Sequence, residues 1–299
     1  MRFQYERISF LVFLLIAIIS ISWAGSCQVS DSSSAENNSP QCESTRKTEI
    51  AKNPSKPPQT PDKPITEDKK NLENLTLDEI LDKLTASNKS LKSYQARMKY
   101  TFIQDPEVID SNTIRKGNIY YQKGKKRSDL LIDFTTIKQD DAPEEKHNEK
   151  YLFDGVYLKI IDFQNKTVNT YQKAEKNNPK DVFEVIGASF PMVGFTRPEF
   201  LKREFNISLA ERTKTTPTHV IPIKLDVKKG SIYEKEYKTI DFWINKAIFL
   251  PARLLTTSTE GDIYDIILTD AKINKKLPKG IFKVETLKDF SETITPLEK

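Results

Sequence analysis

Four segments between residues 219 and 290 alternate apolar and polar residues. Turn signals separate the alternating runs at Lys229-Gly230, Asn245-Lys246, Glu260-Gly261 and Pro278-Lys279-Gly280, and the runs are HVIPIKLDV, YKTIDFWINKAIFLPARLLTTST, GDIYDIILTDAKIN and KLPKGIFKV. A period of two places successive side chains on opposite faces of a strand. The region is therefore predicted to form consecutive antiparallel strands with one apolar face and one polar face.

The same alternation occurs upstream, in residues 91–104, 113–123, 128–136 and 151–162, with a short partner around Val168. A Lys-Gly-Lys-Lys turn is predicted to join the second and third of these strands as a hairpin. The polar run that precedes Tyr151, from Lys138 to Lys150, is interpreted as an insert. Roughly nine to eleven strands in meander order are expected, a number that tends to make a sheet curl or close.

Helical patterns occur in two places. Thr76 and Glu79 form a Thr-x-x-Glu capping box, and leucine and isoleucine recur at helical spacing behind it. Residues 181–186 and 198–205 are predicted to form two short helices, joined by an apolar loop. The predicted fold class is therefore α+β, an unclosed antiparallel β-barrel with helices capping its concave face.

The concave face of such a sheet has to be covered. The helices could fill it permanently as an ordinary core, or they could form a lid over an apolar hollow that accepts acyl chains, each buried methylene contributing about 0.8 kcal/mol. The candidate cavity residues are Ile119, Tyr121, Leu130, Ile132, Phe134, Ile221, Ile223, Leu225, Ile240, Phe242 and Ile244. The candidate lid residues are Phe183, Ile186, Phe190, Phe200, Leu201 and Phe205.

The first residues have the pattern of a secretory signal. Basic residues precede an apolar run over residues 8–21, and the small residues 24–26 lead to Cys27. The run is short for a transmembrane helix, so residues 1–26 are predicted to be a signal peptide. The segment resembles a bacterial lipobox, which predicts a lipidated Cys27; the alternative is a plain secretory signal with a coincidental cysteine. Gln28 in place of aspartate favours the outer membrane over the inner.

Residues 27–71 are rich in Ser, Pro, Lys and Glu and contain few large apolar side chains. Such a segment cannot bury enough surface to order itself, so it is predicted to be a disordered tether in front of a folded domain, residues 72–299. Cys42 is the only other cysteine, so an acylated Cys27 leaves no internal disulfide.

The composition argues against several function classes. The 47 Lys and Arg residues are interspersed with the 42 Asp and Glu residues, so nucleic acid is a poor partner. His147 and His219 have no partner at metal-ligand spacing, and neither a phosphate-binding glycine loop nor a Gly-x-Ser-x-Gly elbow is present. The acidic pairs 140–141 and 144–145 are interpreted as solvated loop. We therefore expect a non-enzyme without a metal or cofactor.

Several short motifs in residues 75–290 occur in an order that resembles the family of the lipoprotein carrier LolA and its lipid-anchored receptor LolB. They are Leu77-x-x-Ile80-Leu81-x-x-Leu84, Gly117–Arg127, Phe153-Asp154-Gly155 before Ile161-Asp162, and Ile267–Asn274 before Leu277-Pro278 and Phe282. The resemblance implies a helix-capped half-barrel with a cavity for lipoprotein acyl chains and no catalysis. It also implies that Arg127 holds the lid closed; the alternative is a surface arginine in a basic turn.

Together these features predict a lipid-anchored monomer on the periplasmic side of the cell envelope that binds acyl chains or lipoproteins in lipoprotein sorting. The rival interpretation is the same fold with a filled core, acting as a structural or sensory module that binds an envelope protein. A third is a hydrolase of envelope polymers. An enclosed apolar volume would separate the first two.

Overall fold

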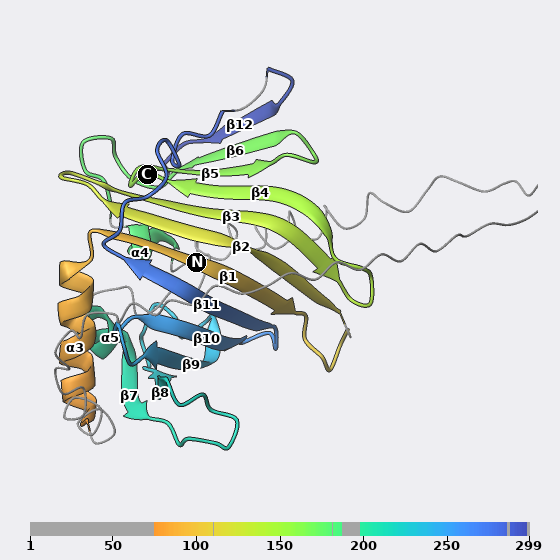
Figure 1. Ribbon diagram of the computed structural model, residues 1–299. Helices are drawn as coiled ribbons and strands as arrows, with labels where there is room; N and C mark the ends of the chain where they lie inside the picture. Colours follow the sequence, from red (N-terminus) through yellow and green to blue (C-terminus); the bar gives the residue numbers. More distant parts are fainter. Residues whose placement is uncertain (1–74, 110, 181, 187–197, 286–287, 298–299) are drawn as a thin grey trace, which may run out of the picture. The chain divides into compact units, whose positions relative to one another are not determined.

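The computed structural model describes the chain in five ranges, residues 75–109, 111–180, 182–186, 198–285 and 288–297. Its labels are those of Figure 1. The described elements belong to one compact unit, residues 62–299, called the folded unit below. The buried apolar core lies within it, between Ile80 and Leu268, as in an independently folding domain. The predicted signal peptide, Cys27 and all of the predicted tether fall outside the described ranges.

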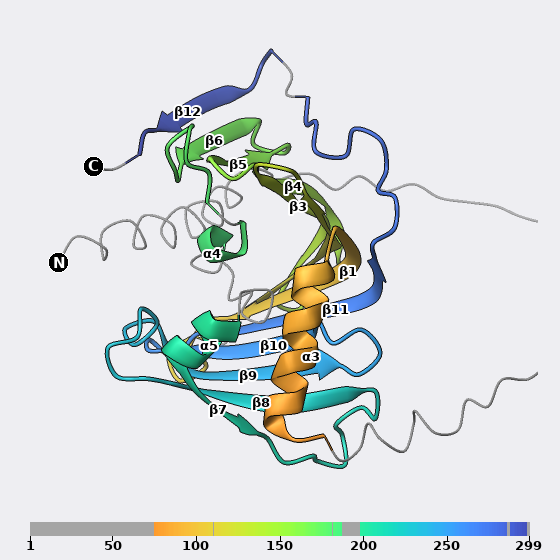
Figure 2. The ribbon, with the colours of Figure 1, turned by 90° about the vertical axis from the view of Figure 1, so that its left-hand side faces the viewer.

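Twelve strands of the described residues form one sheet in the order β12-β6-β5-β4-β3-β2-β1-β11-β10-β9-β8-β7 (Figures 1 and 2). The strands are β1 Ser93–Ile103, β2 Asn112–Lys123, β3 Ser128–Gln139, β4 Glu145–Phe153, β5 Tyr157–Asp162, β6 Thr167–Gln172, β7 Phe205–Leu209, β8 Val220–Val227, β9 Tyr237–Asn245, β10 Pro251–Ser258, β11 Ile263–Ile273 and β12 Ser291–Thr295. Two meanders, β1–β6 and β7–β11, join where β1 pairs with β11. All pairs are antiparallel except β12 with β6.

The sheet curves without closing, because β12 and β7 remain as its two edges. Both edge strands were missed in the sequence, since β7 follows directly on a helix and β12 is a short polar strand with exposed side chains. The predicted fold class, an unclosed antiparallel barrel with helices on its concave face, is confirmed.

Within the described ranges three helices accompany the sheet: α3 Leu77–Ser90, α4 Val182–Ile186 and α5 Pro198–Glu204. The predicted capping box is present at α3, where the Glu79 amide donates to Thr76 Oγ1 at 3.3 Å and the Thr76 amide donates to Glu79 Oε2 at 2.7 Å. Figure 2 shows α4 and α5 within the curve of the sheet and α3 across one end of its strands. The apolar stripe of α3, with Leu84 fully buried, joins the inner core.

Two sequence-based boundaries were wrong. The polar run 138–150 is mostly strand, because β3 continues to Gln139 and β4 begins at Glu145. Its side chains point alternately to solvent and to a polar cluster inside the barrel. Because both faces are polar, the sequence shows no apolar-polar alternation there. Phe205 was expected at the end of a helix, but α5 ends at Glu204 and Phe205 begins β7.

The outer face of strands β3–β6 is not simply polar. Leu131, Ile161 and Val168 are almost completely buried there. The C-terminal segment covers them: Figure 2 shows it leaving β11 and running along the outside of the sheet to β12. The ring of Phe290 packs edge-on against Phe163 at 5.6 Å. The run KLPKGIFKV, expected to be a strand, contains none and belongs to this outer covering.

Gly117 is required by a close approach of two strands. It lies opposite Phe134 at a bulge between β2 and β3, and a Cβ atom there would be 2.0 Å from the Asp133 carbonyl oxygen. Gly117→Ala is therefore expected to lower the free energy of unfolding by about 1–3 kcal/mol, as overpacking does. Urea denaturation of the folded unit measures it.

The control is Gly230→Asn, in a turn with φ +80° where nothing lies within 4 Å of an added Cβ. Asparagine tolerates this conformation, so the control is expected to change stability by less than about 0.5 kcal/mol. Equal losses in the two variants would contradict the account of Gly117.

Candidate functional site

The inner face of the sheet is continuous across both meanders. The predicted cavity residues all belong to one apolar cluster, and the most exposed of them, Ile221, is only 7% exposed. They lie on β2, β3, β8 and β9, so the alternation placed them correctly on one face. Phe134 connects the polar and apolar parts of this face, with ring centroids 6.2 Å from Tyr100 and 6.0 Å from Tyr151.

Helix α4 contacts the inner face through its first residues. Phe183, a predicted lid residue, packs its ring against Tyr121 with the centroids 4.8 Å apart, and the neighbouring Val182 is fully buried. Of the other predicted lid residues, Phe190 and the side chain of Ile186 lie outside the described residues. This five-residue helix is anchored to the sheet by aromatic and aliphatic contact.

Helix α5 contributes a second set of contacts. Leu201 is fully buried, and the ring of Phe200 meets Tyr233 edge-on at 6.1 Å. Phe205, at the start of β7, stacks on the same tyrosine at 5.2 Å. Tyr233 therefore contacts two of the predicted lid residues, Phe200 and Phe205. Its position in a polar turn between β8 and β9 did not indicate this role.

Arg127 does not face the predicted lid residues. Leu130 points inward, so by alternation Arg127 and Asp129 point outward, and Arg127 Nη1 lies 3.4 Å from Asp154 Oδ2. The Asp154 carboxylate also accepts from the Val156 and Tyr157 amides at 3.0 and 2.7 Å. The arginine thus supports the tight turn between β4 and β5, on the outer side of the sheet.

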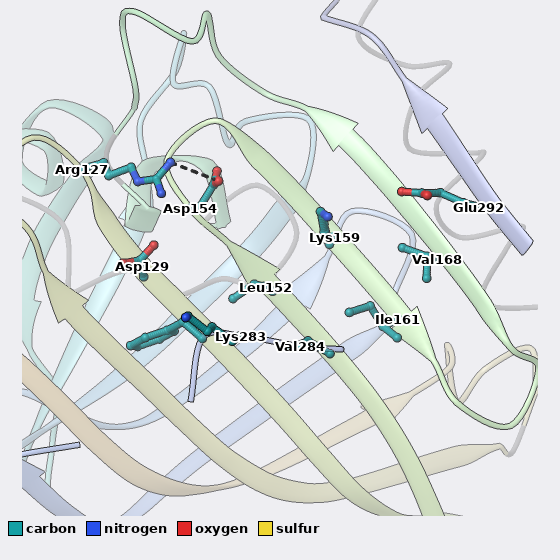
Figure 3. A pocket seen from close by; sticks show the side chains of 11 residues that line it. Arg127, Asp129, Leu152, Asp154, Lys159, Ile161, Val168, Lys283, Val284 and Glu292 are labelled. Atoms are coloured by element: carbon teal, nitrogen blue, oxygen red, sulfur yellow. Dashed lines mark hydrogen bonds and ion pairs between the residues drawn. The ribbon is translucent and has the colours of Figure 1, made fainter. Parts of the chain in front are cut away.

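A hollow of about 390 Å³ adjoins this arginine on the outer face (Figure 3). Leu152, Ile161 and Val168 form its apolar floor, and the C-terminal segment forms one wall. Its charged side chains are Arg127, Lys159, Lys283, Asp129, Asp154 and Glu292. Because the positive and negative groups balance, the hollow has no charge preference of its own.

A second hollow, of about 330 Å³, lies between α3 and the edge strand β7. Leu77 and Leu81 line it from the helix, and Phe205 and Ile207 from the strand. Lys202 and Lys228 stand with Asp78 and Asn206 among its polar lining residues. Apolar and polar residues line this groove in equal number, and it borders the core that the helices cover.

A buried ion pair interrupts the inner face. Arg115 on β2 and Glu149 on β4 reach across β3, and their Nε and Oε2 atoms are 3.2 Å apart. Both side chains are 11% exposed. The Tyr151 hydroxyl donates to Glu149 Oε1 at 2.7 Å, and His147 Nε2 lies 3.8 Å from Oε2. The Arg115 N–H is not directed at Oε2, so neither of these two buried atoms has a hydrogen bond within the described part of the chain.

The cluster is charged at neutral pH. Burial acts to raise the pKa of Glu149, but His147, Arg115 and the Tyr151 hydroxyl outweigh it and hold that pKa below its usual range. Burial likewise acts to lower the pKa of Arg115, and the nearby Glu149 carboxylate reverses the effect and leaves that pKa raised. The two groups therefore form a buried pair of opposite charges.

Sequence reasoning missed this cluster because only apolar residues were sought on the inner face. The detectable signal was register: His147, Glu149, Tyr151 and Phe153 follow a period of two, which places all four on one face. The acidic pairs 140–141 and 144–145 lie instead where β3 turns into β4. Among them, Asp140 Oδ1 accepts from the Asn112 amide at 2.7 Å, which is a turn-stabilising role.

Acid is expected to weaken the fold through Glu149. Its pKa is lower folded than unfolded, so its stabilisation is complete above the ordinary value of 4.5 and is lost as the pH falls through the folded-state pKa. The free energy of unfolding should therefore fall when the pH is lowered below 4.5. Urea titrations of the folded unit at a series of pH values measure this slope.

Glu149→Gln is the comparison for the acid slope. The amide cannot titrate, so the variant is less stable at neutral pH but loses less on acidification than the unmodified protein. Identical acid slopes in the two proteins would contradict the assignment to Glu149.

In the described ranges, no group of three or more His, Cys, Asp and Glu side chains is placed to hold a metal ion. The same ranges contain no helix with the length and apolarity needed to cross a membrane.

The chain matches no protein-family model, and no curated protein matches it. Among solved structures, an uncharacterized conserved protein from Thermus thermophilus is similar, with TM-score 0.41 and 12% identity over 73% of this chain and 98% of that chain. The structure of the Pseudomonas aeruginosa MucA/MucB complex is similar with TM-score 0.37 and 12% identity, over 69% of this chain and 60% of that chain. A LolA superfamily protein from Nitrosomonas europaea is similar with TM-score 0.31 and 14% identity, over 72% of this chain and 100% of that chain. At such low scores and identities, these similarities carry no argument about what the chain binds.

Proposed function

We propose that this protein binds acyl chains against the inner face of its half-barrel, under a cover formed by α3, α4 and α5. The observation that carries the proposal is the largely apolar inner face, which both meanders supply and whose cover comes from separate helices. Large apolar surfaces of this kind are stable only when something apolar covers them. Acyl chains match the aliphatic and aromatic lining.

The cover has the properties expected of a lid. Helix α4 has five residues and rests on the sheet through Phe183 and Val182. Short helices with few apolar anchors open at lower free energy than the strands beneath them. The groove between α3 and β7 is the proposed entry, since it reaches the covered face from the sheet edge. In this proposal Arg127 and Asp154 support the turn between β4 and β5, whose Gly155 carbonyl accepts from the Lys180 amide just before α4.

The cellular setting is part of the same proposal. A lipidated Cys27 would hold the folded unit near a membrane on the periplasmic side, and the outer membrane is favoured by Gln28. An anchored lipid-binding domain suits a step that receives or holds lipid or lipoprotein in sorting. Catalysis is not part of this proposal, which rests on binding alone.

The test is binding of an apolar fluorescent probe to the folded unit. The proposal expects saturable binding of the probe and its displacement by long-chain lipids. As a control, the same probe is titrated after unfolding in urea, which destroys the inner face. A folded unit that takes up no probe contradicts the proposal.

A second candidate has one observation in its favour. The residues expected to line the cavity are already almost fully buried, which is also what a filled core requires. Under this alternative the protein is a structural or sensory module that binds an envelope protein on its outer surface. Absence of probe binding, together with a fully cooperative and lipid-independent unfolding transition, would support it.

A further inference from the structure

The pair of Arg115 and Glu149 is unusual because it occupies an otherwise apolar inner face. Burying two charges costs more than an apolar pair unless good hydrogen bonds compensate. Here the geometry is incomplete: Arg115 Nε and Glu149 Oε2 are buried atoms without hydrogen bonds among the described residues. The face therefore holds a donor and an acceptor that attract each other as an ion pair at 3.2 Å but are not hydrogen-bonded to each other.

The charges around this pair decide which ligand chemistry fits. The positive Arg115 and the negative Glu149 cancel, and Asp162 lies opposite Glu149 on the neighbouring strand β5. The Tyr151 hydroxyl is a donor already directed at the other oxygen of Glu149. A carboxylate or phosphate placed here would find no net positive charge in a buried site, which disfavours it. A neutral group with both an acceptor and a donor is complementary.

The position of the pair fixes how such a ligand would lie. Arg115 is opposite Tyr100 in the half of β1 that is distant from α3, because α3 ends just before β1 begins. The rings of Tyr100, Phe134 and Tyr151 surround this part of the face. From here Ile119 and Ile132 continue the apolar surface toward the helices. A polar head at Arg115 would therefore leave an acyl chain on aliphatic side chains.

We infer that the inner face takes uncharged acylglycerols, with an ester carbonyl accepting from Arg115 and a glycerol hydroxyl donating to Glu149 Oε2. This inference rests on the proposed acyl-chain binding and adds the class of head group. These hydrogen bonds would satisfy two buried atoms that have an ion-pair contact but no hydrogen bond among the described residues. They therefore distinguish an acylglycerol from a lipid of equal chain length that lacks these groups.

The experiment compares two lipids with the same oleoyl chain in displacing the apolar probe from the folded unit. Monooleoylglycerol carries the ester and hydroxyls, and oleate at about pH 8 is an anion. Monooleoylglycerol is expected to compete at least about tenfold better than oleate, as charged-partner hydrogen bonds allow. The double variant Arg115→Met with Glu149→Met is expected to bind the probe but to lose this preference.

The matched control is Arg253→Met with Asp265→Met. This pair joins β10 and β11 through two contacts of 2.7 and 3.0 Å and lies outside the inner cluster, so its removal should leave the preference unchanged. Equal competition by the two lipids, or a preference that survives the Arg115 and Glu149 replacements, overturns the inference. If the double variant does not fold, the competition of monooleoylglycerol against oleate on the wild-type protein tests the inference by itself. Absence of probe binding by the wild type overturns the proposed function itself.

Discussion

Glu149→Ala is expected to lower the free energy of unfolding of the folded unit by about 3–5 kcal/mol, because it leaves Arg115 buried without its counter-charge. Glu149 is 11% exposed on its side chain, so water cannot replace the lost carboxylate freely. The Tyr151 hydroxyl loses its acceptor in the same variant. Urea denaturation at neutral pH measures the loss.

The double replacement Arg115→Met with Glu149→Met is the control for this first prediction. Removing both charges together avoids a lone buried cation, so stability should be close to that of the unmodified protein or above it. A single-variant loss below about 1 kcal/mol, the range of exposed ion pairs, would contradict the burial of the pair.

Leu130→Ala and Leu131→Ala are expected to lose similar stability but to differ in lipid binding. The two leucines are neighbours on β3, both with 0% exposure, and they face opposite sides of the sheet. Each truncation should cost about 2–5 kcal/mol, as buried leucines do. Only Leu130 belongs to the inner cluster, so only its truncation should weaken probe affinity, by about fivefold, from lost apolar contact.

This comparison isolates the inner face because the two variants have the same chemistry and neighbouring positions. Binding is measured where both proteins are folded, as judged by circular dichroism. A Leu131→Ala variant that weakens the probe as much as Leu130→Ala would contradict the assignment of the inner face as the binding surface.

The sequence predicted the inner face well because alternation is a local signal. Alternation places Ile221, Ile223 and Leu225 on one face of their strand. The antiparallel neighbours must then place their own apolar residues on that same face. The capping box at Thr76 was equally local and is present. Both predictions depended on residues within a few positions of each other.

The polar cluster and the outer covering could not be predicted in the same way. Arg115 and Glu149 are joined by strand register across β3, and nothing near either residue in the chain indicates the other. The polar run 138–150 looked like a loop because one side of the strand is solvated and the other carries charges. Phe290 meets Phe163 only after the chain has crossed the sheet. Such contacts depend on topology, which local patterns do not determine.

Native mass spectrometry shows whether acyl chains complete the inner face. The folded unit would be expressed behind a cleavable secretory signal and purified without detergent. We expect a population whose mass exceeds that of the chain by one bound lipid, which solvent extraction releases for identification. A single species with the mass of the chain alone, unchanged after incubation with monooleoylglycerol, would contradict the claim.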